Sequence, residues 1–170
     1  LTNRDAQNLR LVEIDPKQPG KENWKNVIPE SKHVLRTVSV VSGKLLVAYL
    51  EDVSSKLYVY SMDGRKISEV ELPTMGSARG FSGKPDDKEI FFSFSSFAYP
   101  PTVFRYDVIS GEIDLYKQAV IDVDFDHYET NQIFYPSKDG TMIPMFITHK
   151  KGLKQDGSAP TLLYGYGGFN

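Results

Sequence analysis

The sequence predicts a mainly β protein, with residues 1–120 forming part of a β-propeller. Short runs rich in β-branched and aromatic residues alternate with turn dipeptides, which is typical of strands joined by hairpins. One strand pattern recurs at a period of 46 residues, close to the length of a propeller blade. Helical periodicity is weak, because the best candidate, Glu22–Ile28, is cut short by Pro29. An irregular β-sandwich is the alternative arrangement of the same strands.

The predicted strands of the first part follow one another with turn signals between them. The turns are marked by Ser42-Gly43, Asp63-Gly64 and Ser110-Gly111, in which glycine supplies the positive φ of a tight turn. The predicted strands are Leu11–Asp15, Lys44–Glu51, Lys56–Met62, Lys88–Ser95 and Thr102–Val108.

The repeat defines the extent of the propeller part. Asp15, Ser61 and Asp107 close three similar strand patterns, 46 residues apart. The same step from Asp107 leads to Leu153 in a polar loop, so the repeat ends and a domain boundary is expected near Val120. The first part then holds about two and a half blades, whereas propellers have typically 4–8. The first part therefore cannot close into a ring, and we expect it to be truncated.

Residues 121–170 are expected to begin a different domain. They predict a hairpin with strands at Gln132–Ser137 and Met142–Lys150 around the turn dipeptide Asp139-Gly140. After a polar loop, the apolar run from Pro160 predicts a further strand. That strand ends in the glycine-rich segment "YGYGGFN", Tyr164–Asn170.

Composition excludes several classes of protein. Lys plus Arg is 20 and Asp plus Glu is 22, a net charge of -2 without a basic block, so no nucleic-acid partner is expected. The apolar runs are far shorter than the roughly 18 residues of a membrane-spanning helix, so no membrane partner is expected. The chain has no cysteine, which excludes disulfides and cysteine-based zinc sites and favours a reducing compartment such as the cytoplasm.

Two patterns that could indicate catalysis are better explained structurally. "GSARG", Gly76–Gly80, misses the Gly-x-Ser-x-Gly nucleophile motif by one place, and its serine is expected in a turn. The three histidines, His33, His127 and His149, have no partner at metal-ligand spacing. We expect each of them to be an ordinary strand or loop residue.

Three alternating carboxylates could indicate a calcium loop. Asp122, Asp124 and Asp126 have suitable spacing, but the glycine and the closing glutamate of such a loop are missing. An extended segment with solvated carboxylates on one face explains the pattern better. We therefore expect no metal ion and no cofactor.

The glycine-rich segment is the strongest candidate for chemistry. Gly165, Gly167 and Gly168 allow sharp turns and the close approach of another group. Tyr166, which lies between them, presents a phenol donor on a rigid ring. Such a donor beside a reacting carbonyl stabilises an oxyanion, and α/β-hydrolases take one oxyanion donor from the loop after the third strand. The alternative is a strand end without chemistry.

The stretch "FYPSKDGTMIPMFITHKKGLKQDGSAPTLLYGYGGFN", Phe134–Asn170, closely resembles the prolyl oligopeptidases. "EIFFSFSSFAYPPTVFRYDV" is similar to the last propeller blade of that family. The resemblance implies a propeller over residues 1–120 and the start of an α/β-hydrolase domain over residues 121–170. It also implies a monomeric serine peptidase that uses a Ser-His-Asp triad to cleave short proline-containing peptides after proline.

The same resemblance implies roles for two residues. Tyr166 matches the tyrosine whose phenol enters the oxyanion hole, and Phe169 matches the phenylalanine that lines the pocket for the substrate proline. In the family the whole triad lies downstream of this motif and the early propeller blades lie upstream of this stretch. The resemblance therefore implies an internal fragment of a longer protein, and the chain alone is expected to be inactive. One alternative is a propeller interaction module with a degenerate hydrolase part, and another is a peptidase of the same superfamily with a different specificity.

Overall fold

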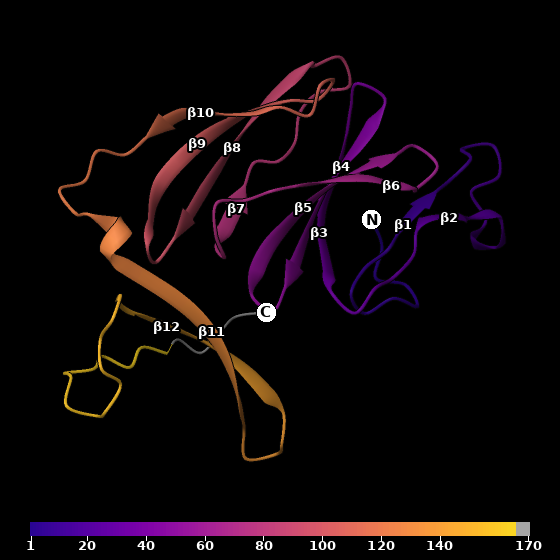
Figure 1. The fold of residues 1–170 in the computed structure, drawn as a ribbon. Helices are drawn as coiled ribbons and strands as arrows, with labels where there is room; N and C mark the ends of the chain where they lie inside the picture. Colours follow the sequence, from indigo (N-terminus) through magenta and orange to yellow (C-terminus); the bar gives the residue numbers. More distant parts are fainter. Residues whose placement is uncertain (166–170) are drawn as a thin grey trace.

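The computed structural model describes residues 1–165, and these form antiparallel sheets joined by short connections (Figure 1). The mainly β prediction is confirmed, since the helical segments among these residues are two 3-10 turns, η1 (Lys21–Asn23) and η2 (Phe125–His127). None of these helical turns is long and apolar enough to cross a membrane. The strands are β1 (Leu11–Glu13), β2 (Lys25–Ile28), β3 (Val34–Val41), β4 (Lys44–Glu51), β5 (Ser54–Ser61), β6 (Lys66–Val70), β7 (Ser77–Arg79), β8 (Glu89–Ser96), β9 (Tyr99–Asp107), β10 (Ile113–Gln118), β11 (Tyr128–Pro136) and β12 (Met142–Lys150).

Two four-stranded sheets make up most of the molecule. Their strands follow sequence order, β3-β4-β5-β6 and β7-β8-β9-β10, and each pair of neighbours is antiparallel. Ser61 and Asp107, which the repeat aligns, are the last residues of the third strand in each sheet. The 46-residue period therefore corresponds to one four-stranded sheet.

The strand predictions differ in accuracy for a physical reason. β4 and β12 have the predicted bounds, because their apolar and aromatic runs end at glycine turns or polar loops. The predicted set lacks β2, β3, β6, β7 and β10. All six residues of β10 are exposed and β7 has only three residues, so neither shows a strong apolar alternation. Pairing with a neighbouring strand determines such edge segments more than their own composition does.

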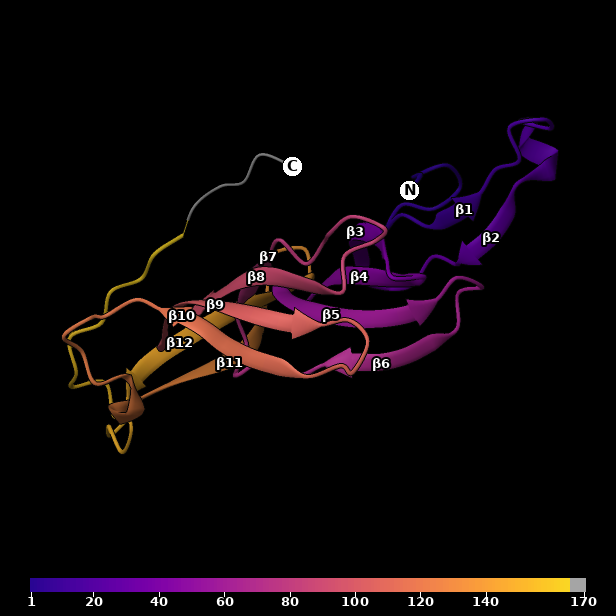
Figure 2. The same cartoon turned by 90° about the horizontal axis from the view of Figure 1, so that it is seen from above.

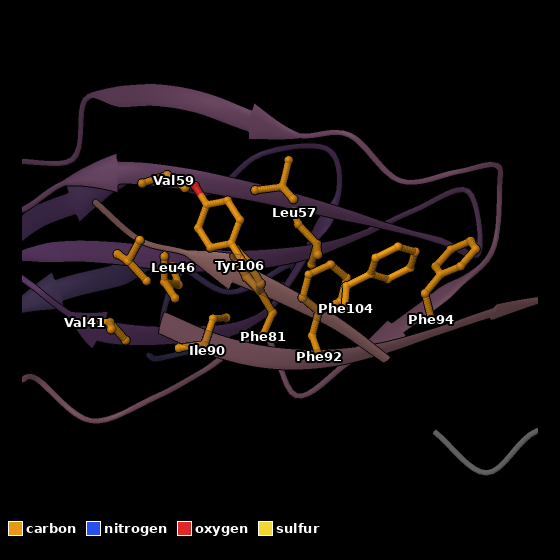
Figure 3. Close-up of a cluster of buried hydrophobic side chains, with 12 residues drawn as sticks. Val41, Leu46, Leu57, Val59, Phe81, Ile90, Phe92, Phe94, Phe104 and Tyr106 are labelled. Carbon is orange, nitrogen blue, oxygen red and sulfur yellow. The ribbon is translucent and has the colours of Figure 1, made fainter. Parts of the chain in front are cut away.

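The main core lies between the two four-stranded sheets (Figure 3). Phe92 and Phe104 from the second sheet stack with ring centroids 5.6 Å apart, and Phe81 meets Phe92 edge-on. The first sheet contributes Leu46 and Val59 from its central strands. This face-to-face packing removes the apolar sides of both sheets from water, which is the main stabilising term of such an arrangement.

A second core covers the other side of the first sheet. It joins Ile28 of β2 to Leu35, Val47 and Tyr58 of the first sheet. β4 is therefore buried on both faces, whereas β8 alternates between exposed and buried residues. The sheet β1-β2, the first four-stranded sheet and the second thus stack in a row, with β1-β2 at one end (Figure 2).

The turn between β5 and β6 requires a glycine because it touches the neighbouring sheet. Gly64 has φ +86°, and a Cβ there would lie 1.8 Å from the backbone oxygen of Val27 in β2. Gly43, in the turn between β3 and β4, has φ +69° but open space around it. A side chain at either position would therefore meet the same backbone strain, but only one at position 64 would also clash with a neighbouring strand.

We expect Gly64→Ala to lower the free energy of unfolding by about 2–3 kcal/mol and Gly43→Ala by about 1 kcal/mol. Both alanines meet the left-handed backbone penalty, but only the one at position 64 must also displace Val27. The urea midpoints of the two variants measure the difference. Equal midpoints would show that the contact with Val27 adds nothing.

Candidate functional site

Residues 160–165, which lead into the glycine-rich segment, belong to no strand and are largely exposed. Leu162, Leu163 and Tyr164 are 91%, 83% and 81% exposed. The strand predicted from Pro160 is therefore absent between residues 160 and 165. A strand needs a neighbour to satisfy its backbone groups, and residues 1–165 provide none at this place. The two predicted site residues, Tyr166 and Phe169, lie outside the described residues.

The hairpin β11-β12 leads the chain to this region. Its strands pair in uninterrupted register from Tyr128↔Lys150 to Pro136↔Met142. At the turn, the Thr141 N–H donates to the Asp139 carboxylate, which lowers the pKa of Asp139. This turn matches the Asp-Gly signal in the sequence, and a continuous register makes the hairpin a regular support for the loop after β12.

One face of the hairpin contacts the turns of the two four-stranded sheets. Figure 1 shows the hairpin below these sheets. The Gln132 side-chain amide donates to the backbone oxygen of Asp52, between β4 and β5, at 2.5 Å. The Phe146 ring lies 5.8 Å from that of Phe97, between β8 and β9. Because Gln132 and Phe146 are directly paired, both contacts come from the same face of the hairpin.

The three histidines each lie near a carboxylate. The shortest nitrogen–oxygen distances are 3.8 Å for His33 to Glu51, 3.3 Å for His127 to Asp124 and 3.6 Å for His149 to Glu129. No serine hydroxyl within residues 1–165 hydrogen-bonds to an imidazole ring. The described part of the chain therefore lacks the serine–histidine contact on which nucleophilic catalysis by serine depends.

The pair His33–Glu51 belongs to a structural cluster in the first sheet. The Tyr58 hydroxyl donates to Glu51 at 3.0 Å, and Lys66 lies 3.8 Å from the centre of the Tyr58 ring. Burial, followed by the hydrogen bond to Glu51, raises the pKa of Tyr58. Its phenol therefore stays protonated and acts as a donor to the carboxylate, so the cluster connects strands and presents no free reactive group.

The acidic segment 122–126 follows its predicted extended form only in part, since Asp124 is extended and a 3-10 turn begins at Phe125. The Asp124 side chain accepts from the Asp126 N–H and caps the 3-10 turn η2. This local hydrogen bond favours the turn after Asp124 over a continued extended backbone, as is usual for aspartate. Two open hollows of about 540 and 440 Å³ border the segment. Within residues 1–165, no three His, Asp or Glu side chains are grouped so that they could hold a metal ion.

The serine of "GSARG" also differs from its prediction. Ser77 begins the strand β7 instead of lying in a turn. The preceding Gly76 approaches the backbone closely, since a Cβ there would lie 2.5 Å from the oxygen of Ser95. The glycine is therefore explained by packing and not by catalysis.

Sequence reasoning missed three residues that position the hairpin and the loop after it. Gln132 and Phe146 contact turns of the sheets, and Gln155 contacts His149. Isolated glutamine and phenylalanine residues carry no local signal, because their partners at Asp52 and Phe97 are far away along the chain. Only the packed structure reveals these contacts.

Comparison with known proteins gives consistent matches. Residues 1–119 match the family model described as the prolyl oligopeptidase N-terminal β-propeller domain. Prolyl endopeptidases of Elizabethkingia miricola and Elizabethkingia meningoseptica are 40% and 39% identical over 99% and 100% of this chain. The chain spans 24% of the length of each, about a quarter of these relatives.

Solved structures show the same arrangement. A structure from a study of two prolyl endopeptidases and their inter-domain dynamics has a TM-score of 0.90 at 38% identity, over 98% of this chain and 25% of that chain. Prolyl oligopeptidase B from Galerina marginata, bound to a 35-residue hydrolysis and macrocyclization substrate, has a TM-score of 0.84 at 31% identity. The match covers 98% of this chain and 24% of that chain.

Proposed function

Because the chain belongs to the prolyl oligopeptidase family, we propose that the whole protein is a serine peptidase that cleaves short peptides after proline. The proposal rests on the 40% identity to a prolyl endopeptidase over 99% of this chain. The Phe134–Asn170 stretch, which holds the glycine-rich segment, adds to this support. The homologues are peptidases of the serine type, so acyl transfer is the reaction class.

We further propose that the chain ends a propeller and begins the catalytic domain, with the boundary near Val120. The last strand of the second four-stranded sheet ends at Gln118, and the family model matches up to residue 119. The two four-stranded sheets and β1-β2 would then be about two and a half blades. The hairpin β11-β12 would be the first element of the α/β-hydrolase part.

In the proposed reaction the serine of the triad attacks the carbonyl of the proline residue, while the histidine takes its proton. The carbonyl oxygen becomes negatively charged in the tetrahedral intermediate. The Tyr166 phenol and one backbone N–H would donate to this oxygen, and the Phe169 ring would form a flat apolar wall for the proline ring. The triad itself would come from other parts of the whole protein.

A fluorophosphonate probe, which reacts with activated serines, tests this proposal. We expect the full-length protein to be labelled stoichiometrically and the 170-residue chain alone to remain unlabelled. Labelling should abolish cleavage of a chromogenic peptide with proline before the scissile bond. Heat-denatured full-length protein is the control for non-specific reaction.

The outcomes separate the alternatives. An unlabelled full-length protein would indicate an interaction module with a degenerate hydrolase part. Labelling with cleavage after residues other than proline would indicate a peptidase of different specificity. Stoichiometric labelling of the 170-residue chain would contradict the assignment of the triad to other parts of the protein.

A further inference from the structure

The loop after β12 is joined to the hairpin by few contacts. Near its start, the backbone N–H of Lys151 donates to the His127 carbonyl at 2.8 Å. Farther along, the Gln155 side-chain nitrogen lies 3.1 Å from Nε2 of His149. The hydrogen bonds made by side chains between Asp156 and Gly165 stay within that stretch, from Ser158 to Asp156 and from Thr161 to Ala159.

His149 is held in a defined orientation by β11 and by its own strand. Its side chain is only 9% exposed, and it lies opposite Glu129 in the hairpin register. Nδ1 is 2.9 Å from the Lys150 carbonyl oxygen and 3.6 Å from Glu129 Oε1. Since a carbonyl oxygen only accepts, Nδ1 carries the proton and donates to it. Nε2 is then left with a lone pair that accepts from the Gln155 amide.

The hairpin therefore uses its two faces differently. Gln132 and Phe146 lie on the face that contacts the turns of the sheets. Glu129 and His149 lie on the opposite face, because neighbouring residues of a strand point in opposite directions. The second face thus holds the loop, and the first holds the hairpin against the two four-stranded sheets.

We propose that His149 is a positioning residue for the proposed oxyanion donor Tyr166: its Nε2 anchors Gln155 and so fixes the path of the chain toward Tyr166. The inference rests on the proposed function of Tyr166. An oxyanion donor must lie within hydrogen-bond distance of the reacting oxygen, and small displacements of such a group reduce the rate strongly. Leu162 and Tyr164, which follow the anchor, are exposed and give the path no other support within residues 1–165.

The kinetic test uses full-length protein with matched substitutions. His149→Phe keeps a planar ring and removes both nitrogens, whereas His149→Gln restores an oxygen acceptor near the place of Nε2. We expect His149→Phe and Gln155→Ala each to lower kcat about tenfold with KM within about twofold, and His149→Gln to recover most of the loss. His127→Phe is the control, because the His127 side chain is exposed and does not contact Gln155. A kcat unchanged by Gln155→Ala would overturn the inference.

A double-mutant cycle separates positioning from a general loss of stability. In the Tyr166→Phe background the phenol is already gone, so His149→Phe should lower kcat by less than about twofold. A tenfold loss in both backgrounds would mean that His149 acts independently of Tyr166, which would overturn the inference.

Amide hydrogen exchange in residues 151–160 gives a readout that does not depend on activity. We expect His149→Phe and Gln155→Ala to accelerate exchange in this loop about tenfold, and His127→Phe to leave it unchanged. If Tyr166→Phe alone leaves kcat unchanged, the proposed oxyanion role fails, and this measurement decides whether His149 anchors the loop. Unchanged exchange in both His149→Phe and Gln155→Ala would overturn the inference. If the His149→Phe variant does not fold, the amide exchange of the Gln155→Ala variant alone tests the inference.

Discussion

Replacing Tyr166 with phenylalanine is expected to lower kcat of the full-length peptidase about 10²–10³-fold and to leave KM nearly unchanged. The phenol would donate to an oxygen that is negatively charged only in the transition state and the intermediate. An interaction of this kind accelerates the chemical step without tightening substrate binding. Steady-state kinetics on a proline-containing chromogenic peptide measure both constants.

Tyr164→Phe is the matched control for this prediction, because it removes the same hydroxyl from the neighbouring tyrosine. The Tyr164 side chain is exposed, and we assign it no chemical role. Its kcat should stay within about threefold of the unchanged protein. A Tyr166→Phe effect confined to KM, or equal effects of the two substitutions, would contradict the oxyanion assignment.

Phe92→Ala is expected to lower the free energy of unfolding by about 3–5 kcal/mol. The Phe92 side chain is 1% exposed and lies between the sheets, stacked on Phe104 and edge-on to Phe81. Removing the ring leaves a cavity that the paired strands on both sides cannot easily close, and it also removes two aromatic contacts. Chemical denaturation followed by far-ultraviolet circular dichroism measures the loss.

Ile67→Ala is the control for this loss, since it also truncates a large apolar residue in a strand. Ile67 lies in the outer strand β6 and is 50% exposed, so its truncation should cost less than about 1 kcal/mol. Similar losses for the two variants would mean that packing between the sheets is not the main source of stability at Phe92.

The two faces of the hairpin β11-β12 explain how the fold supports the proposed site. The Gln132 and Phe146 contacts set the hairpin against turns of both four-stranded sheets. The His149 contact on the other face holds the loop that leads to Tyr166. The path of the loop after β12 therefore depends on packing of the sheets as well as on local sequence.

Local sequence predicted the strands and turns that depend only on residues close together in the chain. β4 and β12 were predicted with their observed bounds, because β-branched and aromatic runs between turn signals favour strands wherever they lie. The turns at Gly43 and Gly64 were predicted because a positive φ favours glycine. The repeat was predicted because each four-stranded sheet uses a similar pattern.

The sequence by itself determined the mainly β class, the period of its sheets, the glycine turns and the resemblance that indicates the family. Only the tertiary structure decided that residues 160–165 pair with no strand of residues 1–165, that Gln132 and Phe146 contact the sheets, and that His149 holds Gln155. The physical reason is that strand and turn preferences act within a few residues. Strand pairing and side-chain contacts depend instead on groups that folding brings together from distant parts of the chain.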